Sequence, residues 1–375
     1  MRKKLIALVI FILAVMGVIA IIHPPGGSTN DSSASYSGTS AAEVATSYKN
    51  NLELNWTQTN KMPSLDSYIT PSSGNVYVAK DVPYCSSGDQ KLLLDLYSNK
   101  QPSAGGLQPM VVYLHGGGMV EGDKAQIDSP ISRVLLNLVE NGFIVASVNY
   151  QLAPAYKFPA QIQDALCAMR FMRYYAYGIG GNQNKIGIFG DSVGAQLSSL
   201  AGVTSGVEPW ENSNSMHLAG TDLTYEDYLK IPSKPNAVVH YYGSSQLPES
   251  PIALFFMRFM GNWHDPWTGQ DRPLVDMMKE IYPDSTAMHE AGAINYVTAG
   301  EPPFLIVQGD KDKLNPENLS TDLYNKLKSY RNSATLVIVQ NADHGLVSNP
   351  PGSTINPSLD SIVNTTVSFL ESNLK

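Results

Sequence analysis

The fold predicted for this chain depends on the segment Lys185-Ile186-Gly187-Ile188-Phe189-Gly190-Asp191-Ser192-Val193-Gly194. This segment opens as a mostly apolar strand, and the small-residue segment Ala195 to Gly202 after it is typical of a helix. A turn this sharp between a strand and a helix strains its central residue and leaves no room for flanking side chains, which explains the glycines. The hydroxyl of Ser192 is therefore expected above a sheet, at a helix N-terminus, in the position of a nucleophile.

Polar elements also follow three other predicted strands. His115-Gly116-Gly117-Gly118 comes before the serine turn, whereas Gly309-Asp310-Lys311-Asp312 and His344 come after it. Ligands bind at the carboxyl ends of strands in an open parallel sheet, so we expect these elements to gather around Ser192. The strands that precede them are Met110–Leu114, Phe304–Val307 and Thr335–Val339.

Strands and helices alternate from about Tyr77 to the C-terminus. Such alternation predicts an α/β protein with a mostly parallel, doubly wound sheet covered by helices on both faces. A helix is predicted over Ile162–Tyr174. Two further segments rich in β-branched or aromatic residues, Phe143–Val148 and Ala237–Tyr242, are predicted as strands.

The motifs, taken in order, resemble those of the HGGG-bearing α/β-hydrolase esterases. This group includes hormone-sensitive-lipase-like carboxylesterases and related polysaccharide-side-chain esterases. The resemblance covers roughly Tyr77 to the C-terminus and extends to Leu94-Asp95-Leu96-Tyr97 and Asn149-Tyr150-Gln151-Leu152-Ala153-Pro154. It implies an α/β-hydrolase fold with lid-type insertions, and hydrolysis of carboxylic esters.

The resemblance also implies roles for single residues. Ser192 is expected to be the nucleophile and His344 the base that takes its proton. The family places its acid third after the loop glycine, which selects Asp312 as the carboxylate that orients the imidazole. Asp310 is the rival for this role, and Asp343 is a more distant candidate because it is adjacent to the histidine in sequence.

The oxyanion donors implied by the resemblance are the backbone amides of Gly117, Gly118 and Val193. His115 is expected to order the loop by hydrogen bonding. Two departures from the family pattern affect this region. Met119 stands where an aromatic residue usually follows HGGG, and Gln151 replaces the usual arginine of Y-R-L-A-P.

Two segments interrupt the alternation and are expected to be insertions. Residues 204–236 are polar and loop-like, and residues 246–300 are longer and richer in aromatic residues and methionine. By resemblance the second insertion is a lid over the nucleophile, and its large side chains either line an apolar substrate pocket or pack a small core of their own. These side chains are Phe255, Phe256, Met257, Phe259, Met260, Trp263 and Trp267.

The N-terminus predicts export. Arg2-Lys3-Lys4 precedes the uncharged apolar stretch Leu5 to Ile22, so residues 1–23 are expected to be a membrane anchor or a cleaved signal segment. Residues 24–50 are rich in Gly, Ser and Thr and predict a flexible linker. Residues 51–375 are the predicted catalytic domain. It is expected outside the cytoplasm, held at the membrane or secreted if the segment is cleaved.

Composition excludes other classes of protein. The chain has 375 residues, with 25 basic against 33 acidic side chains, and lacks the basic clusters that bind nucleic acid. No H-E-x-x-H or paired-cysteine motif predicts a metal, and no phosphate-binding loop predicts a nucleotide cofactor. The two cysteines, Cys85 and Cys167, could pair in an exported protein, but a buried free thiol is the commoner state for a cysteine in a helix such as that around Cys167.

The predicted function is hydrolysis of a small-molecule ester with a short or medium acyl chain, through an acyl-enzyme. Lipase, formamidase and peptidase activities on the same fold are the alternatives. A non-catalytic binding module is a further alternative, although such modules have usually lost the serine, acid or histidine, and this chain keeps all three. No oligomeric state is predicted.

Overall fold

The computed structural model describes residues 54–59, 62–63, 68–69, 76–101, 106–125, 127, 129–204, 216–248, 262–264 and 270–375. The predicted anchor or signal and the predicted linker lie outside these residues. Within them, no helix combines the length and the apolar character needed to cross a bilayer.

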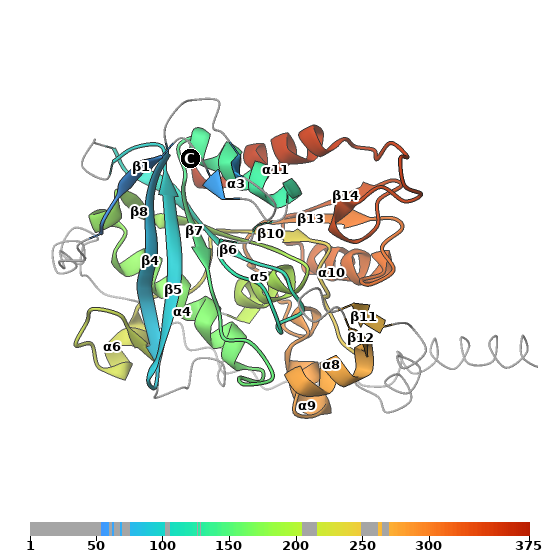
Figure 1. Ribbon diagram of the computed structural model, residues 1–375, viewed down its shortest axis with the longest axis horizontal. Coiled ribbons are helices and arrows are strands. Elements are labelled where there is room, and N and C mark those ends of the chain that lie inside the picture. The colour runs from blue at the N-terminus through green and yellow to red at the C-terminus, as the bar shows by residue number, and fades with distance from the viewer. Residues whose placement is uncertain are drawn as a thin grey trace, which may run out of the picture. The chain divides into compact units, whose positions relative to one another are not determined.

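The centre of the fold is a ten-stranded mixed sheet in the order β1-β4-β5-β7-β6-β8-β10-β13-β14, with β9 paired to β4 (Figure 1). Every neighbouring pair from β7 to β14 is parallel, whereas β1, β4, β5 and β9 pair antiparallel. The mostly parallel sheet predicted from the sequence is confirmed. The strands are β1 Thr57–Thr59, β4 Val76–Ser87, β5 Gln90–Ser98, β6 Gln108–Leu114, β7 Ile144–Val148, β8 Gly181–Asp191, β9 Met216–Leu218, β10 Ala237–Tyr241, β13 Phe304–Gly309 and β14 Ala334–Val339.

Helices cover both faces of this sheet, as Figure 1 shows. Helices α3 and α11 contact each other and pack on one face, where Leu135, Leu138 and Leu370 belong to one buried apolar cluster. Helices α4, α5 and α10 contribute to a second cluster on the opposite face. The doubly wound arrangement is thereby confirmed. The helices are α3 Ser129–Glu140, α4 Ala160–Tyr174, α5 Val193–Thr204, α10 Glu317–Ser329 and α11 Leu359–Leu374.

Burial explains why the central strands carry almost continuous apolar runs. Every residue of β6, β7, β10 and β13 is buried, because helices exclude water from both faces. Consequently the predicted strands match the observed ones to within a few residues at each end. Because β6, β8, β13 and β14 belong to the parallel part of the sheet, their carboxyl ends lie along the same edge, and the polar motifs begin there.

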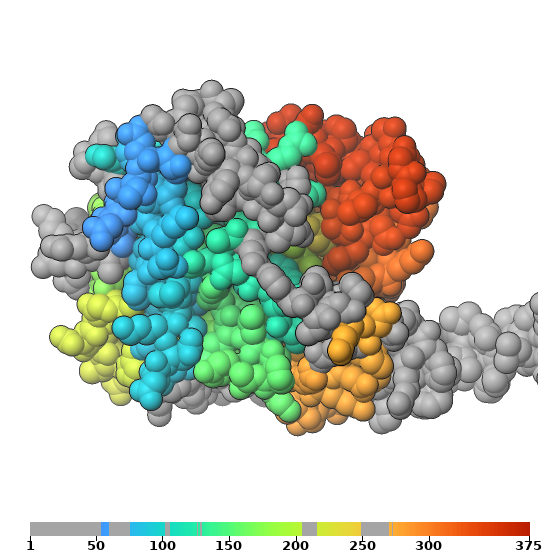
Figure 2. Space-filling view, viewed as in Figure 1, coloured from blue at the N-terminus to red at the C-terminus, as the bar shows by residue number. Residues whose placement is uncertain are grey.

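Both predicted insertions contain more regular structure than the sequence suggested. In the described part of residues 204–236, β9 extends the sheet beside β4, and α6, Tyr225–Lys230, follows it. The space-filling view shows α6 next to the β4 and β5 segments on one face (Figure 2). The described part of residues 246–300 holds α8, α9 and a short hairpin. These elements are α8 Leu274–Ile281, α9 Ser285–Glu290, β11 Asn262–His264 and β12 Asp271–Pro273.

The aromatic and methionine side chains singled out in the second insertion lie outside the described side chains. Their proposed choice between a substrate pocket and a small separate core therefore stays a prediction. The part that is described does reach the glycine loop, because the Sδ atom of Met277 in α8 lies 3.4 Å from the position that a Cβ on Gly118 would occupy.

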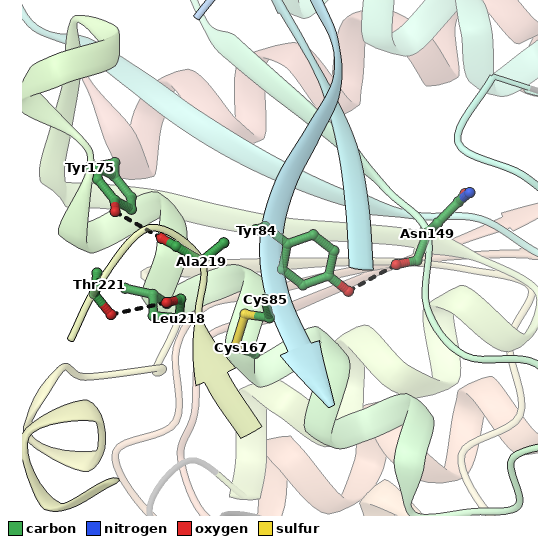
Figure 3. Close-up of a disulfide and its surroundings, with 8 residues drawn as sticks. All are labelled: Tyr84, Cys85, Asn149, Cys167, Tyr175, Leu218, Ala219 and Thr221. Carbon is green, nitrogen blue, oxygen red and sulfur yellow. Dashed lines mark hydrogen bonds between the residues drawn. A yellow bond between two sulfur atoms is a disulfide. The ribbon is translucent and has the colours of Figure 1, made fainter. Parts of the chain in front are cut away.

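The preference for a free thiol at Cys167 is wrong. Cys85 of β4 and Cys167 of α4 form a disulfide, with Cα atoms 6.4 Å apart (Figure 3). Helix α4 packs across β4, which brings together two residues separated by 82 positions in the sequence. The local sequence around each cysteine does not indicate that α4 packs across β4. The disulfide therefore becomes evident only from the tertiary structure.

We expect this disulfide to contribute substantially to stability. In the chain-entropy account, closing a loop of this length lowers the conformational entropy of the unfolded chain by an amount worth about 4.5 kcal/mol. Unfolding in urea should therefore begin at clearly lower denaturant concentration when a reductant is present. A Cys85→Ser/Cys167→Ser double variant should resemble the reduced protein and ignore the reductant. Equal midpoints for the parent with and without reductant would contradict this expectation.

Candidate active site

Ser192 occupies a strained turn between β8 and α5. Its φ of 51° lies in the left-handed region, which a serine adopts only when the surroundings enforce it. A Cβ on Gly190 would collide with the carbonyl of Gly194, and a Cβ on Gly194 would collide with the carbonyl of Leu114. Both glycines are therefore required for the turn, as the sequence predicted.

The three side chains selected from the sequence converge at this turn. His344 Nε2 lies 3.0 Å from Ser192 Oγ, and His344 Nδ1 lies 2.9 Å from Asp312 Oδ2. An ionised carboxylate can only accept hydrogen bonds, so Nδ1 carries the imidazole proton and Nε2 is left to accept from the serine hydroxyl. These hydrogen bonds run in the order required of a catalytic triad, with Ser192 as the nucleophile, His344 as the base and Asp312 as the acid.

Neighbouring groups fix the Asp312 carboxylate in this orientation. Its Oδ1 accepts from the backbone N–H groups of Leu314 and Asn315, at 2.9 and 2.8 Å. Its Oδ2 accepts from Gln308 Nε2 at 3.2 Å in addition to the imidazole. The side chain is fully buried, so water does not compete for these bonds.

The rival acids lie elsewhere. Asp310 forms an ion pair with Lys311, with 2.7 Å between Oδ2 and Nζ. Asp343 accepts from the backbone N–H groups of His344 and Lys313, at 2.9 and 3.2 Å, so it orders the histidine loop without facing the imidazole nitrogens. Among the three candidates, only Asp312 is placed against His344 Nδ1.

The glycine loop after β6 has the backbone shape expected of an anion-binding turn. Gly117 and Gly118 have φ values of 102° and 62°, and Met119 continues the left-handed run at 62°. The loop adjoins the nucleophile, since a Cβ on Gly116 would lie 3.3 Å from Ser192 Cβ. Val193, the third expected donor, is the first residue of α5, where backbone N–H groups have no partner inside the helix.

Met119, the departure from the family pattern, points into the protein. Its side chain is fully buried, and the Tyr282 hydroxyl donates to its Sδ at 3.8 Å. The same hydroxyl accepts from Gln196 Nε2 of α5 at 3.1 Å. Apolar and weakly polar groups thus pack beside the glycine loop, where Met277 lies next to Gly118.

Two other histidines are buried for structural reasons, and the role of His115 is the one predicted. His115 Nδ1 donates to Gly116 O at 2.7 Å and so orders the loop, and burial lowers the pKa of its imidazole to about 4. His240 in β10 lies 2.7 Å from Ser199 Oγ, and burial lowers its pKa to about 4 as well. Both rings are therefore neutral at physiological pH.

Sequence reasoning missed several residues that support the site. The ring of Tyr242, directly after β10, packs edge-on against His344 with centroids 5.1 Å apart. Asn315 Nδ2 donates to Tyr242 O at 2.8 Å, linking the acid loop to this ring. Gln308, whose Nε2 donates to Asp312 Oδ2, was given no role from the sequence because it directly follows the predicted strand Phe304–Val307. The one signal in the sequence was the position of Asn315, three residues after Asp312, because an aspartate commonly accepts the backbone N–H groups of the residues that follow it.

Fold and site together define an α/β hydrolase with a serine nucleophile turn. A model of the BD-FAE family matches residues 94–327, more than half of the chain, and the protein belongs to that family. The family and fold inferred from the sequence are thus confirmed.

Individual relatives agree with this assignment. Esterase LipC of Mycobacterium tuberculosis is 26% identical over 68% of this chain and 57% of its own length. Carboxylesterase NlhH of the same species is 39% identical over a shorter region, 24% of this chain and 28% of its own. The chain spans about half the length of the first curated relatives it matches.

Solved structures show the same fold. A truncated carbohydrate esterase from gut microbiota superposes with a TM-score of 0.58 at 24% identity, covering 84% of this chain and 99% of that one. A propionate-bound esterase of Thermogutta terrifontis superposes with a TM-score of 0.56 at 18% identity, covering 76% and 92%.

Proposed function

We propose that this protein hydrolyses carboxylic esters with a short or medium acyl chain, through a Ser192–His344–Asp312 triad. The observation that carries the proposal is the continuous relay from Oγ through both imidazole nitrogens to a buried carboxylate, beside a glycine loop. The curated relatives named as esterases support it.

Acylation begins when Ser192 Oγ attacks the ester carbonyl carbon and its proton passes to His344 Nε2. The carbonyl oxygen becomes an oxyanion, which the N–H groups of Gly117, Gly118 and Val193 stabilise. The C–O bond to the alcohol then breaks, and the alcohol leaves with the proton that Nε2 held. Asp312 stabilises the imidazolium throughout, by accepting from Nδ1.

Deacylation repeats the sequence with water. His344 Nε2 takes a proton from the water molecule as its oxygen attacks the acyl carbon. The second tetrahedral intermediate uses the same amides, and its collapse returns the proton to Ser192 Oγ and releases the carboxylic acid. No metal or redox cofactor enters this scheme.

A short acyl group suits the surroundings of the glycine loop. The alcohol oxygen must reach His344 Nε2, and the carbonyl oxygen must face the amides of the glycine loop after β6, so the side chains packed beside that loop adjoin the bound ester. Beside the loop Met119 and Tyr282 are buried and Met277 packs next to Gly118, which limits the room for a long chain.

We further propose that the enzyme works outside the cytoplasm, held by residues 1–23 at the membrane or released if that segment is cleaved. The disulfide between Cys85 and Cys167 supports this location, because such bonds persist in oxidising compartments.

A series of p-nitrophenyl esters tests the proposed reaction. The purified full chain should hydrolyse the acetate and butyrate without added metal, and kcat/KM should fall steeply from butyrate to dodecanoate. A rise in kcat/KM with chain length would favour the lipase alternative. No hydrolysis of any ester in the series would favour a non-catalytic module, or an amide or peptide substrate.

A further inference from the structure

We propose that Tyr150 is a positioning residue whose hydroxyl holds the peptide groups of the glycine loop so that the Gly117 amide faces the oxyanion. The inference rests on the proposed ester hydrolysis and assigns a role that neither the triad nor the glycine motif contains. Tyr150 lies in the segment directly after β7, the strand next to β6 in the sheet.

Tyr150 contacts the loop with both its ring and its hydroxyl. The side chain is buried, with 4% of its surface exposed, and its ring stacks on the His115 imidazole with centroids 4.3 Å apart. The hydroxyl donates to His115 O at 2.8 Å and lies 3.3 Å from Gly116 O. Two consecutive loop carbonyls are therefore oriented toward one phenol.

The direction of a carbonyl fixes the direction of the next amide. In a trans peptide the C=O and N–H bonds point to opposite sides, and the described non-proline peptides are all trans. Gly116 O is held by Tyr150 and by His115 Nδ1, so Gly117 N–H points away from that pair. Gly117 O in turn accepts from the amides of Val120 and Glu121, both at 3.1 Å, which sets Gly118 N–H.

The segment that carries Tyr150 is itself well anchored. Gln151 N donates to the buried Asp164 Oδ2 at 2.7 Å, and Ala153 N donates to Met119 O at 2.8 Å. The second of these bonds holds the far end of the glycine loop, while Tyr150 holds its near end. A rigid template of this kind keeps amides aligned before substrate arrives, which is the condition for strong oxyanion stabilisation.

The experiment compares Tyr150→Phe with Tyr175→Phe. Tyr175 is a matched control because it is 2% exposed and its hydroxyl also donates to a backbone carbonyl, Ala219 O, at 2.8 Å (Figure 3). Tyr150→Phe keeps the aromatic ring that stacks on His115 and removes only the hydroxyl. Active-site titration with an organophosphate normalises each kcat to the amount of folded enzyme.

For Tyr150→Phe we expect kcat for p-nitrophenyl acetate to fall about tenfold with KM unchanged, less than the ~10²–10³ lost with a whole oxyanion donor. The affinity for a trifluoromethyl ketone, which forms a tetrahedral adduct, should fall by a similar factor. Tyr175→Phe should lose comparable thermal stability and keep both values.

Two results would overturn these ideas, and they are distinguishable. If the parent hydrolyses the ester but Tyr150→Phe keeps its kcat and its ketone affinity, or changes no more than Tyr175→Phe, the positioning role is wrong. If the parent itself shows no hydrolysis that depends on Ser192, the proposed function fails, and the inference fails with it.

Discussion

Replacing Ser192 by alanine is expected to lower kcat for p-nitrophenyl acetate by about 10⁶. The serine oxygen is the atom that forms the acyl-enzyme, and among the described residues its hydroxyl is the one hydrogen-bonded to His344 Nε2, 3.0 Å away. The residual rate of the variant should still exceed the rate in water, by the roughly 10³–10⁴ that oxyanion stabilisation and binding provide in comparable triads.

Ser198→Ala serves as the matched control for this prediction. Ser198 lies on α5, the helix that begins directly after Ser192; it is fully buried, and its hydroxyl has no hydrogen-bond partner among the described residues. Its kcat should stay within a few-fold of the parent. Indistinguishable rates for Ser192→Ala and the parent would remove Ser192 from the reaction, whatever the geometry around it.

Much of this fold could be predicted from the sequence, because the features that determine its strands and the serine turn depend on residues close together in the chain. Strand length, apolar runs and the glycines flanking Ser192 each act within about ten residues, and the structure reproduces them. The order of the polar elements then places His344 and the acid loop, since parallel strands deliver their carboxyl ends to one edge.

The features that sequence did not reveal depend on contacts between distant elements. The disulfide needs α4 to cross β4, and the stacking of Tyr150 on His115 needs β7 to lie beside β6. The choice of Asp312 over Asp310 rested on the family pattern, because the two carboxylates differ by only two positions. In the structure they differ in surroundings, one being buried against an imidazole and the other paired with Lys311.

Replacing Asp312 by asparagine is expected to lower kcat by about 10⁴ while leaving the fold intact. The backbone N–H groups of Leu314 and Asn315 require an acceptor at the Oδ1 position, so the asparagine carbonyl must take that place. Its NH₂ group then occupies the Oδ2 position and faces His344 Nδ1. A donor there favours the tautomer with the proton on Nε2, and that nitrogen can no longer accept from Ser192.

Asp310→Asn is the control that separates the two acids. Asp310 pairs with Lys311, whose side chain is about half exposed, so the loss of its charge should change kcat by no more than a few-fold. Steady-state kinetics on both variants, together with matching circular dichroism spectra, would check the prediction. An inactive Asp310→Asn beside an active Asp312→Asn would transfer the role of acid to Asp310, and would mean that the loop rearranges when substrate binds.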